Sequence, residues 1–517
     1  SSQSHPSGSS NSIGFAHAIE EGGVLVYNKA IFTDSLFLDN DGLWGKGTFT
    51  EKKTKIVSDH FILLPGRAKG QAESYTLMAQ KVPYSHPDIS GKNIWVEWES
   101  NKDQFRIQSR GKDDPLSMYE GHASLSGIIN ITNDKMAGSG EMTYANGSFT
   151  SDYFNYSGNK ITADTSKFKL LSHNEIGYSF KAEMCNAIID LGNQRSDFIS
   201  TISGNYSSLP SNNYICQLNS FKWNMANDQI EFGSEELAKL NVLWETGKIN
   251  SLPKTSYNTF ISTHFDQDSL SFVTPYAIYD TTNYSISAKF IDKLKIADAE
   301  ILPLHGNLTI NNEGYLEPLS NCKILADTLN KFHKITDALV EVKGRRDYTG
   351  SGFYTYKDEL EEEQEVYFKE ISVDSIGQTI ATGPLTDAME FSLSPDFDFR
   401  GEVHLSAKEQ HLRFNGETQI HSKCDNIKNR WLRFNSSIDP KDILIPIDTI
   451  GRDKENVKIF NSLYLTNDSI HIYPAFLSTR KFYTDNPLLT VDGYLSFNKS
   501  KNLYQVASEE KLKNPEQ

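Results

Sequence analysis

The feature that most constrains this chain is the alternation of apolar and polar residues in many short runs. In residues 94–99 (IWVEWE), Ile94, Val96 and Trp98 share one face. Residues 104–108 (QFRIQ) alternate in the same way. A period of two is typical of a β-strand with one buried face. Asn-Asp, Asn-Gly and Gly-x-Gly turns separate the runs, so the pattern predicts antiparallel hairpins.

Two stretches of the chain match each other without a gap. Residues 40–49 (NDGLWGKGTF) and 58–63 (SDHFIL) align with 133–142 (NDKMAGSGEM) and 151–156 (SDYFNY). The repeat predicts a strand, an Asn-Asp turn, a strand with a Gly-x-Gly pair, a second turn and a third strand. The glycine pair suits a β-bulge or a close crossing of strands, where a Cβ atom would clash.

These patterns predict an all-β, elongated and mostly antiparallel hairpin-repeat protein, made of stacked β-sandwich or open jellyroll units. Apolar spacing predicts only two short helices, at 234–244 and 327–340. A chain of 517 residues is too long for one hydrophobic core. We predict a flexible Ser-rich linker, a β repeat unit, a β repeat unit with a short helix, a jellyroll-like unit, a β unit and a polar tail, at 1–12, 13–108, 109–250, 251–341, 342–506 and 507–517.

Composition excludes several classes of protein. Aromatic residues make up 11 % of the chain, which a disordered protein does not reach. The net charge of -16 repels phosphate backbones, so we expect no nucleic-acid partner. We also expect no transmembrane segment, because no run of 18 apolar residues occurs.

The four cysteines are expected to be single buried thiols rather than zinc ligands, because they are far apart in the sequence. One long-range disulfide remains open. Three histidines lie near the last cysteine in what reads as a hairpin, but a lone histidine on a strand is usually a surface or satisfied residue. The residues concerned are Cys185, Cys216, Cys322, Cys424, His404, His411 and His421.

Other polar groups have structural explanations. Residues 39–42 (DNDG) resemble part of a calcium loop, yet the acids of an EF-hand are missing and a turn is favoured. Asp396 and Asp398 alternate with phenylalanines, which indicates an amphipathic strand before a carboxylate pair for glycoside hydrolysis. The acidic run 359–365 fits a solvated hairpin loop. Trp95 is the better of the tryptophan candidates for stacking on a sugar.

We therefore assign no catalytic, cofactor-binding or metal residues and expect no cofactor. No phosphate-binding Gly-rich loop, His-Glu-x-x-His or Gly-x-Ser-x-Gly motif occurs in the sequence.

Parts of the chain resemble envelope proteins of Gram-negative bacteria. Residues 269–280 (SLSFVTPYAIYD), 286–288 and 296–299, with an echo at 161–164 (ITAD), resemble the OstA/LptA-like family of β-jellyroll proteins. Three further phrases are similar to very large, poorly characterised cell-envelope proteins, at 348–356, 391–395 and 431–434. The resemblance covers about a tenth of the chain, and the irregular spacing here departs from the regular rungs of that family.

The sequence thus favours a non-enzymatic structural or assembly protein of the bacterial cell envelope, acting as a scaffold or interaction module. We expect a periplasmic, outer-membrane-associated or extracellular location and other envelope proteins as partners. The resemblance implies, as an alternative, a lipid or glycolipid conduit with a continuous apolar groove. An extracellular carbohydrate-binding or polysaccharide-degrading protein is the alternative from another class.

Overall fold

A computed structural model describes residues 14–17, 22–40, 42–173, 176–249, 252, 257–422, 430–447, 451–453, 455–467 and 470–514. The chain is nearly all β, with 62 % of residues in strands and 5 % in helices. Neighbouring strands are antiparallel hairpins in large sheets. The predicted fold class, all-β with stacked antiparallel hairpins, is confirmed.

The chain forms two compact units, and the first contains residues 1–264, 273–290 and 309–315. A sheet of 24 strands lies in this unit, apart from Ser271, Phe272 and Leu308 at the ends of two strands. Their bounds are β1 Gly14–His17, β2 Val24–Val26, β3 Ala30–Asp39, β4 Gly42–Glu51, β5 Thr54–Leu64, β6 Arg67–Leu77, β7 Ile89–Glu99, β8 Gln104–Gln108, β9 Leu116–Met118, β10 Ala123–Ile131, β11 Met136–Tyr144, β12 Gly147–Ser157, β13 Lys160–Leu171, β14 Tyr178–Asp190, β15 Arg195–Ser200, β16 Tyr206–Leu209, β17 Tyr214–Gln217, β18 Ser220–Asn224, β19 Gln229–Phe232, β20 Asn258–Ser262, β21 Ser271–Thr274, β22 Tyr276–Asp280, β23 Ser285–Lys289 and β26 Leu308–Ile310.

The second unit contains residues 265–272, 291–308 and 316–517. It has an 11-stranded sheet and two sheets of three strands, β36-β40-β41 and β38-β37-β39. Their bounds are β24 Leu294–Ile296, β25 Ala299–Leu302, β27 Leu319–Ala326, β28 His333–Gly344, β29 Asp347–Lys357, β30 Glu363–Val373, β31 Thr379–Leu385, β32 Ser392–Ser394, β33 Phe397–Ser406, β34 Arg413–Ile420, β35 Trp431–Ser437, β36 Ile445–Ile447, β37 Phe460–Leu465, β38 Ile472–Ser478, β39 Asn486–Thr490, β40 Gly493–Asn498 and β41 Leu503–Ala507.

Helices are few and short in the described chain. The α-helices are α1 Glu235–Glu245 and α2 Glu509–Lys513, and the 3-10 turns are Pro210–Asn212, Phe265–Gln267, Leu304–Gly306 and Asp387–Met389. Among the described residues, neither helix has the length and hydropathy needed to cross a bilayer.

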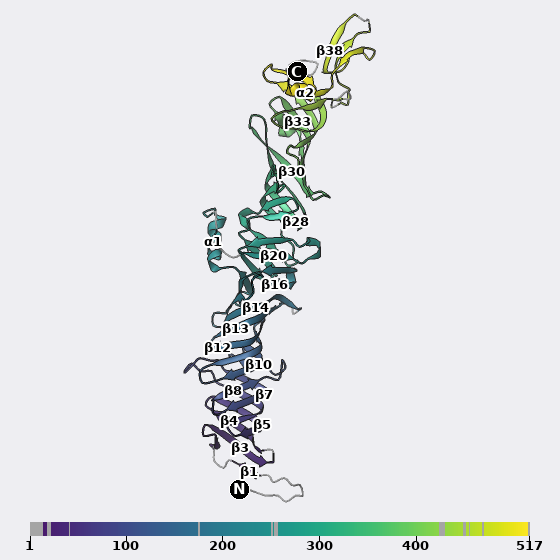
Figure 1. Ribbon diagram of the computed structural model, residues 1–517. Helices are drawn as coiled ribbons and strands as arrows, with labels where there is room; N and C mark the ends of the chain where they lie inside the picture. The colour runs from purple at the N-terminus through teal and green to yellow at the C-terminus, as the bar shows by residue number, and fades with distance from the viewer. Residues whose placement is uncertain are drawn as a thin grey trace. The chain divides into compact units, whose positions relative to one another are not determined.

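Long strands of the first unit pair with different neighbouring strands at their two ends. Strands β3 to β7 pair in chain order, and they follow one another along this unit in Figure 1. One end of β7 then pairs with β8 and the other with β9, and both short strands pair with β10. Beyond β14 the ladders separate, because β15 and β16 pair with different parts of that strand. Each long strand therefore contributes to two layers.

Aromatic side chains show that these layers pack face to face. Phe49 of β4 pairs with Ile56 of β5, which pairs with Tyr75 of β6. Tyr75 in turn pairs with Gly91, near the start of β7. Trp98 lies at the opposite end of β7, yet its ring centroid is 5.3 Å from that of Phe49. Such a contact requires the two halves of the sheet to fold towards each other. Phe49 and Trp98 are 1 % and 0 % exposed, so the space between the halves is closed by their side chains.

A second set of rings fills the layers around β12 to β18. Phe168 pairs with Ala182 at one end of β14, and Phe198 pairs with Ala187 nearer the other. The two rings nevertheless lie 4.6 Å apart between centroids. Phe198 also stacks on Phe221 at 4.4 Å. Small alanines on the neighbouring strand leave room for these rings, which bury a large apolar area for each residue ordered.

The predicted repeat is confirmed in three dimensions. Residues 42–63 contain β4 and most of β5, and residues 133–156 contain the β10–β11 turn, β11 and most of β12. The register shifts between Gly45 and Gly47 in the first copy, and between Gly138 and Gly140 in the second. The Gly-x-Gly pair therefore forms a β-bulge, as predicted, at the same place in both copies.

A buried serine follows each bulge on the next strand. The Ser58 hydroxyl donates to the Gln71 carbonyl at 2.6 Å and accepts the backbone N–H of His60 at 3.2 Å. The Ser151 hydroxyl does the same with the Asp164 carbonyl at 2.8 Å and the Tyr153 N–H at 3.1 Å. Each hydroxyl satisfies backbone groups near the bulge, where the sheet ladder is interrupted.

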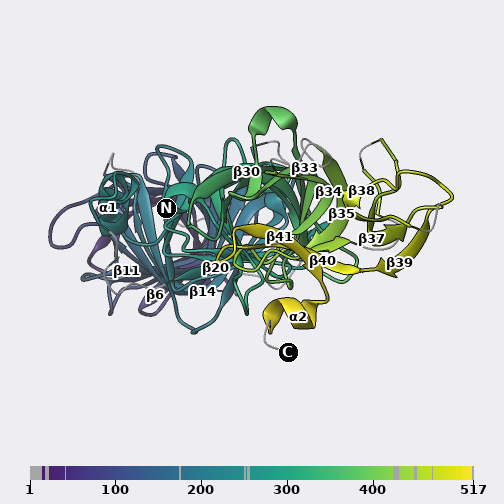
Figure 2. The ribbon, with the colours of Figure 1, turned by 90° about the horizontal axis from the view of Figure 1, so that it is seen from above.

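The predicted helix at 234–244 is confirmed as α1. It packs on the first unit through Leu237, which is 1 % exposed and lies against Tyr276 and Phe290. Trp244 contacts the Phe290 ring edge to face at 5.4 Å. Figures 1 and 2 both show α1 on the outside of the sheet.

The predicted helix at 327–340 is wrong, because most of that segment is strand β28. Burial alternates along β28, but the register shifts between Thr336 and Leu339. Asp337 has a positive φ of 48° at this bulge. The inserted residue places apolar Ile335 and Ala338 three positions apart, which imitates helical spacing.

Hairpin loops of the second unit share one local device. The Asp358 carboxylate accepts the N–H groups of residues 360 and 362, and Asp374 accepts those of residues 376 and 378. Asp453 does the same for residues 455 and 457. An aspartate that satisfies two backbone donors in this way fixes the shape of a tight loop.

Candidate functional site

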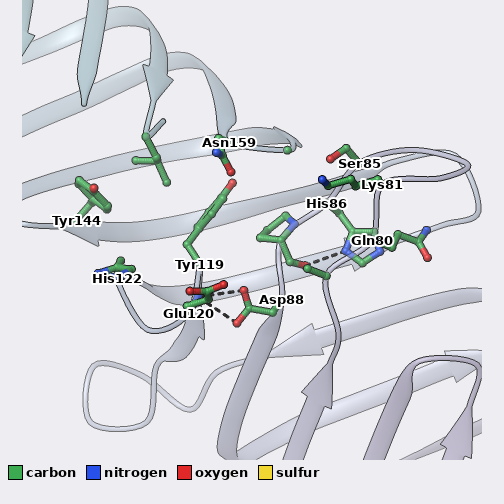
Figure 3. A pocket seen from close by; sticks show the side chains of 14 residues that line it. Gln80, Lys81, Ser85, His86, Asp88, Tyr119, Glu120, His122, Tyr144 and Asn159 are labelled. Carbon is green, nitrogen blue, oxygen red and sulfur yellow. Dashed lines mark hydrogen bonds between the residues drawn. The ribbon is translucent and has the colours of Figure 1, made fainter. Parts of the chain in front are cut away.

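A cleft of about 430 Å³ opens on the first unit, and most of the residues that line it are of polar types. The β6–β7 connection forms one wall and the β9–β10 turn another, and Figure 3 shows the side chains that line it. The volume falls within the roughly 300–1,000 Å³ typical of small-molecule sites. The lining residues are Ala79, Gln80, Lys81, Ser85, His86, Pro87, Asp88, Tyr119, Glu120, His122, Tyr144, Gly158, Asn159 and Leu191.

The β9–β10 turn holds a strained backbone in the wall of the cleft. Tyr119 and Glu120 have φ values of 55° and 58°, and the Gly121 N–H donates to the Met118 carbonyl at 3.2 Å. Two successive left-handed residues make this a hairpin turn in which glycine or asparagine is usual. A bulky residue in that conformation costs about 1–2 kcal/mol.

Asp88 stabilises this turn from the opposite wall. Its carboxylate oxygens accept the Glu120 N–H at 3.0 Å and 3.2 Å, as the dashed lines in Figure 3 show. The contact ties the end of the β6–β7 connection to the β9–β10 turn. The two walls are therefore held together by an interaction at the cleft itself.

The protonation of both ring nitrogens of His86 follows from its contacts and its burial. Its Nδ1 lies 2.8 Å from the Pro87 carbonyl oxygen, and a carbonyl only accepts, so Nδ1 carries the proton. The side chain is 4 % exposed, and this burial lowers the pKa of His86 below its usual range. The ring is therefore neutral at pH 7, and its Nε2 is a hydrogen-bond acceptor.

The Tyr119 hydroxyl is buried and has no hydrogen-bond partner among the described residues. Burial, and secondarily the charge of Asp88, raise the pKa of Tyr119 above its usual range. The hydroxyl is thus neutral and able to donate. Figure 3 shows the Tyr119 ring extending through the cleft region with its hydroxyl end towards Asn159. A buried polar group without a partner costs about 1–3 kcal/mol unless water or a ligand satisfies it.

The cleft combines acceptors and donors without a metal-binding set. Within the described ranges, no group of three or more His, Cys, Asp and Glu side chains is placed to hold a metal ion. The carboxylates of Asp88 and Glu120 accept, the amide of Asn159 does both, and the Tyr144 ring offers an apolar face. This arrangement suits recognition of a small polar molecule.

The histidines singled out in the sequence do not converge. His421 pairs with Asp398 at 2.8 Å, whereas His404 lies 3.8 Å from Glu402 and His411 lies 3.7 Å from Asp439. Each histidine thus has a different acidic neighbour.

Three of the cysteines are buried free thiols. These are Cys185, Cys216 and Cys322, and each lies in a strand, as the sequence indicates. Cys424 falls outside the described residues.

Asp396 and Asp398 flank a buried Phe397 at the start of β33, as the amphipathic-strand interpretation predicts. Burial raises the pKa of Asp396, and the charge of Glu359 adds to this. Asp398 also accepts the Ser392 hydroxyl at 3.0 Å. These carboxylates belong to the second unit and take no part in the cleft.

The other candidate site residues from the sequence lie in strands and loops outside the cleft. In the predicted turn at residues 39–42, Asp39 ends β3 and Gly42 begins β4, and the Trp44 indole N–H donates to Asp39 at 2.9 Å. Asp41 lies outside the described residues. The acidic run 359–365 covers the β29–β30 loop and the start of β30. Trp95 is 38 % exposed and lies outside the cleft lining.

Sequence reasoning missed the cleft, because its walls come from four separate connections. No local motif marks Tyr119 and Glu120, whose residue types do not favour the turn they form. The one available signal was the glycine that follows them in a short polar stretch.

Comparison with known proteins found no match: no family model, no curated protein and no solved structure matches this chain.

Proposed function

We propose that this chain is a non-enzymatic scaffold or assembly protein of the bacterial cell envelope. The observation that carries the proposal is the folded sheet of the first unit. Successive hairpins share backbone hydrogen bonds from β3 to β14, and rings such as Phe49, Trp98 and Phe168 close the space between its layers. Repeated units of this kind supply a rigid body with much exposed sheet, which suits a protein that presents surface to partners.

The envelope location rests on the resemblance of residues 269–280 and 161–164 to the OstA/LptA-like family. Other envelope proteins are the partners that this proposal implies. The acidic net charge of -16 fits a long hydrated surface.

The structure offers less support to a lipid conduit and to a polysaccharide-degrading enzyme. A lipid conduit needs a continuous apolar groove, whereas the rings between the layers of the first unit are nearly unexposed, as at Phe61 and Phe149. A polysaccharide-degrading site would combine exposed tryptophans, which stack on sugar rings, with a carboxylate pair. The cleft has carboxylates at Asp88 and Glu120 but no tryptophan in its lining.

The experiment is fractionation of the source bacterium with an epitope-tagged chain expressed from its own locus. The proposal predicts that the chain sediments with the envelope, and that its deletion sensitises cells to detergent. Complementation with the chain should restore resistance. A chain found only in the cytosol, or a deletion without any envelope defect, would contradict the proposal.

A further inference from the structure

We propose that the cleft between the β6–β7 connection and the β9–β10 turn binds a small neutral saccharide. This inference goes beyond the scaffold function and does not depend on it. It starts from Tyr119, whose hydroxyl is buried at the cleft without a partner among the described residues. The backbone that holds Tyr119 is strained at two successive positions, and strain of this kind concentrates at ligand sites.

The donors and acceptors of the cleft match a hydroxyl-rich ligand. Each sugar hydroxyl donates one hydrogen bond and accepts others, so it satisfies both kinds of group at once. His86 Nε2 and the Asp88 carboxylate accept, whereas the Tyr119 hydroxyl donates. The Tyr144 ring, which is partly exposed in the lining, supplies an apolar face for the C–H side of a sugar ring.

Charge favours a neutral ligand over an anion. Asp88 and Glu120 stand on facing walls and are tied through the Glu120 backbone, so an anionic group would meet two carboxylates. Lys81 is the lysine of the lining, and its side chain is exposed. The neutral His86 adds no positive charge. A carboxylate accepts strongly from a hydroxyl, which lets the same two acids serve a neutral sugar.

The probes are N-acetylglucosamine and galactose as neutral sugars and glucuronate as an anion. Each is titrated against the full chain by saturation-transfer difference NMR. A neutral sugar should bind in the millimolar range, because a ligand of this size has few atoms to bury. Glucuronate should bind more weakly than the best neutral sugar, because its carboxylate would meet those of Asp88 and Glu120.

Two variants locate the binding. Tyr119→Phe keeps the ring and removes only the unpartnered hydroxyl, so affinity should fall roughly tenfold while thermal stability stays level or rises. Asp88→Asn keeps an oxygen that can accept the Glu120 N–H but removes the charge, and it should weaken binding to a similar degree. Tyr153→Phe and Asp152→Asn, on nearby β12 but outside the lining, are the matched controls and should leave affinity unchanged.

Each result of these titrations either supports or overturns the proposed saccharide site. Neutral-sugar binding that both cleft variants weaken and both controls preserve supports the proposal. Binding of none of the three probes, preference for glucuronate, or neutral-sugar binding that Tyr119→Phe leaves intact would each overturn it. The melting curve of Tyr119→Phe separates loss of binding from loss of folding.

Discussion

The indole ring of Trp98 lies 5.3 Å from the phenyl ring of Phe49 at an interplanar angle of 61°, although the two residues sit at opposite ends of the ladder that joins β4 to β7. The contact shows that the sheet of the first unit folds on itself. It also explains how a chain that is only 38 % hydrophobic forms a closed interior. Two layers share one set of large rings, so few residues are needed to fill the space between them.

Removal of the Trp98 ring should destabilise the folded sheet. Trp98→Ala should lower the free energy of opening of β4 to β7 by about 3–5 kcal/mol, because it leaves a cavity between the layers. Hydrogen exchange followed by mass spectrometry measures this opening in peptides from these strands. Trp95→Ala, on the opposite face of the same strand, should cost about 1 kcal/mol or less. Equal effects of the two substitutions would show that the rings do not hold the layers together.

Gly140, the bulge glycine of the second repeat, should not tolerate a side chain. Its backbone conformation and its close approach to the neighbouring strand are two separate reasons. Gly140 has a φ of +129°, and a Cβ there would clash with the Ser126 carbonyl oxygen. Gly111 has a φ of +136° with open space around it. Gly111→Ala should therefore cost about 1–3 kcal/mol for conformation alone, and Gly140→Ala should cost more. Exchange protection of β10 to β12 reports the difference, and similar protection in both variants would contradict the close approach.

Much of this fold could be predicted from the sequence, because its information is local. Alternation identified strands, and the ungapped repeat located both bulges. The bulge in β28 defeated the same reasoning, since an inserted residue converts a period of two into apparent spacing by three. Leu304, Gly306, Leu308 and Ile310 alternate with polar residues in the sequence, as in a strand, but Leu304 and Gly306 lie in a 3-10 turn. The fold of the sheet on itself and the cleft were not predictable, since both depend on contacts such as Phe49–Trp98 and Asp88–Glu120 between distant segments.

The buried cysteines should resist modification in the folded chain. Burial raises the pKa of Cys185 and of Cys322 to about 11, and it raises that of Cys216 as well. A thiol with so little thiolate reacts slowly at pH 8. The Cys424→Ser variant should therefore show no thiol that reacts with Ellman's reagent until guanidinium exposes the other three. Rapid reaction in the folded state would show that a strand bearing one of these thiols is open.

The second unit should lose stability as the pH falls from 7 to 5.5. His333 is fully buried, and its Nε2 lies 2.6 Å from the Glu409 carbonyl. Burial lowers the pKa of His333, and the neighbouring His411 adds to this, while the Tyr354 hydroxyl lies 3.4 Å from Nδ1. Below the unfolded value of about 6.5, the unfolded chain therefore binds a proton that the folded chain does not.

This linkage destabilises the folded state by up to about 1.4 kcal/mol per pH unit. His333→Gln removes the titrating group and should flatten the dependence of exchange protection in β28 on pH, after correction for the intrinsic exchange rate. An unchanged slope in the variant would assign the dependence to other groups.

Lipid extraction followed by mass spectrometry shows whether the interior of the first unit is closed. The sample is the full chain, purified under mild conditions from a bacterial envelope fraction. The layers of the first unit are closed by rings such as those of Phe49, Phe61 and Trp98, so we predict no lipid bound in stoichiometric amount. One or more lipid molecules retained per chain would contradict the closed interior and favour a conduit over a scaffold.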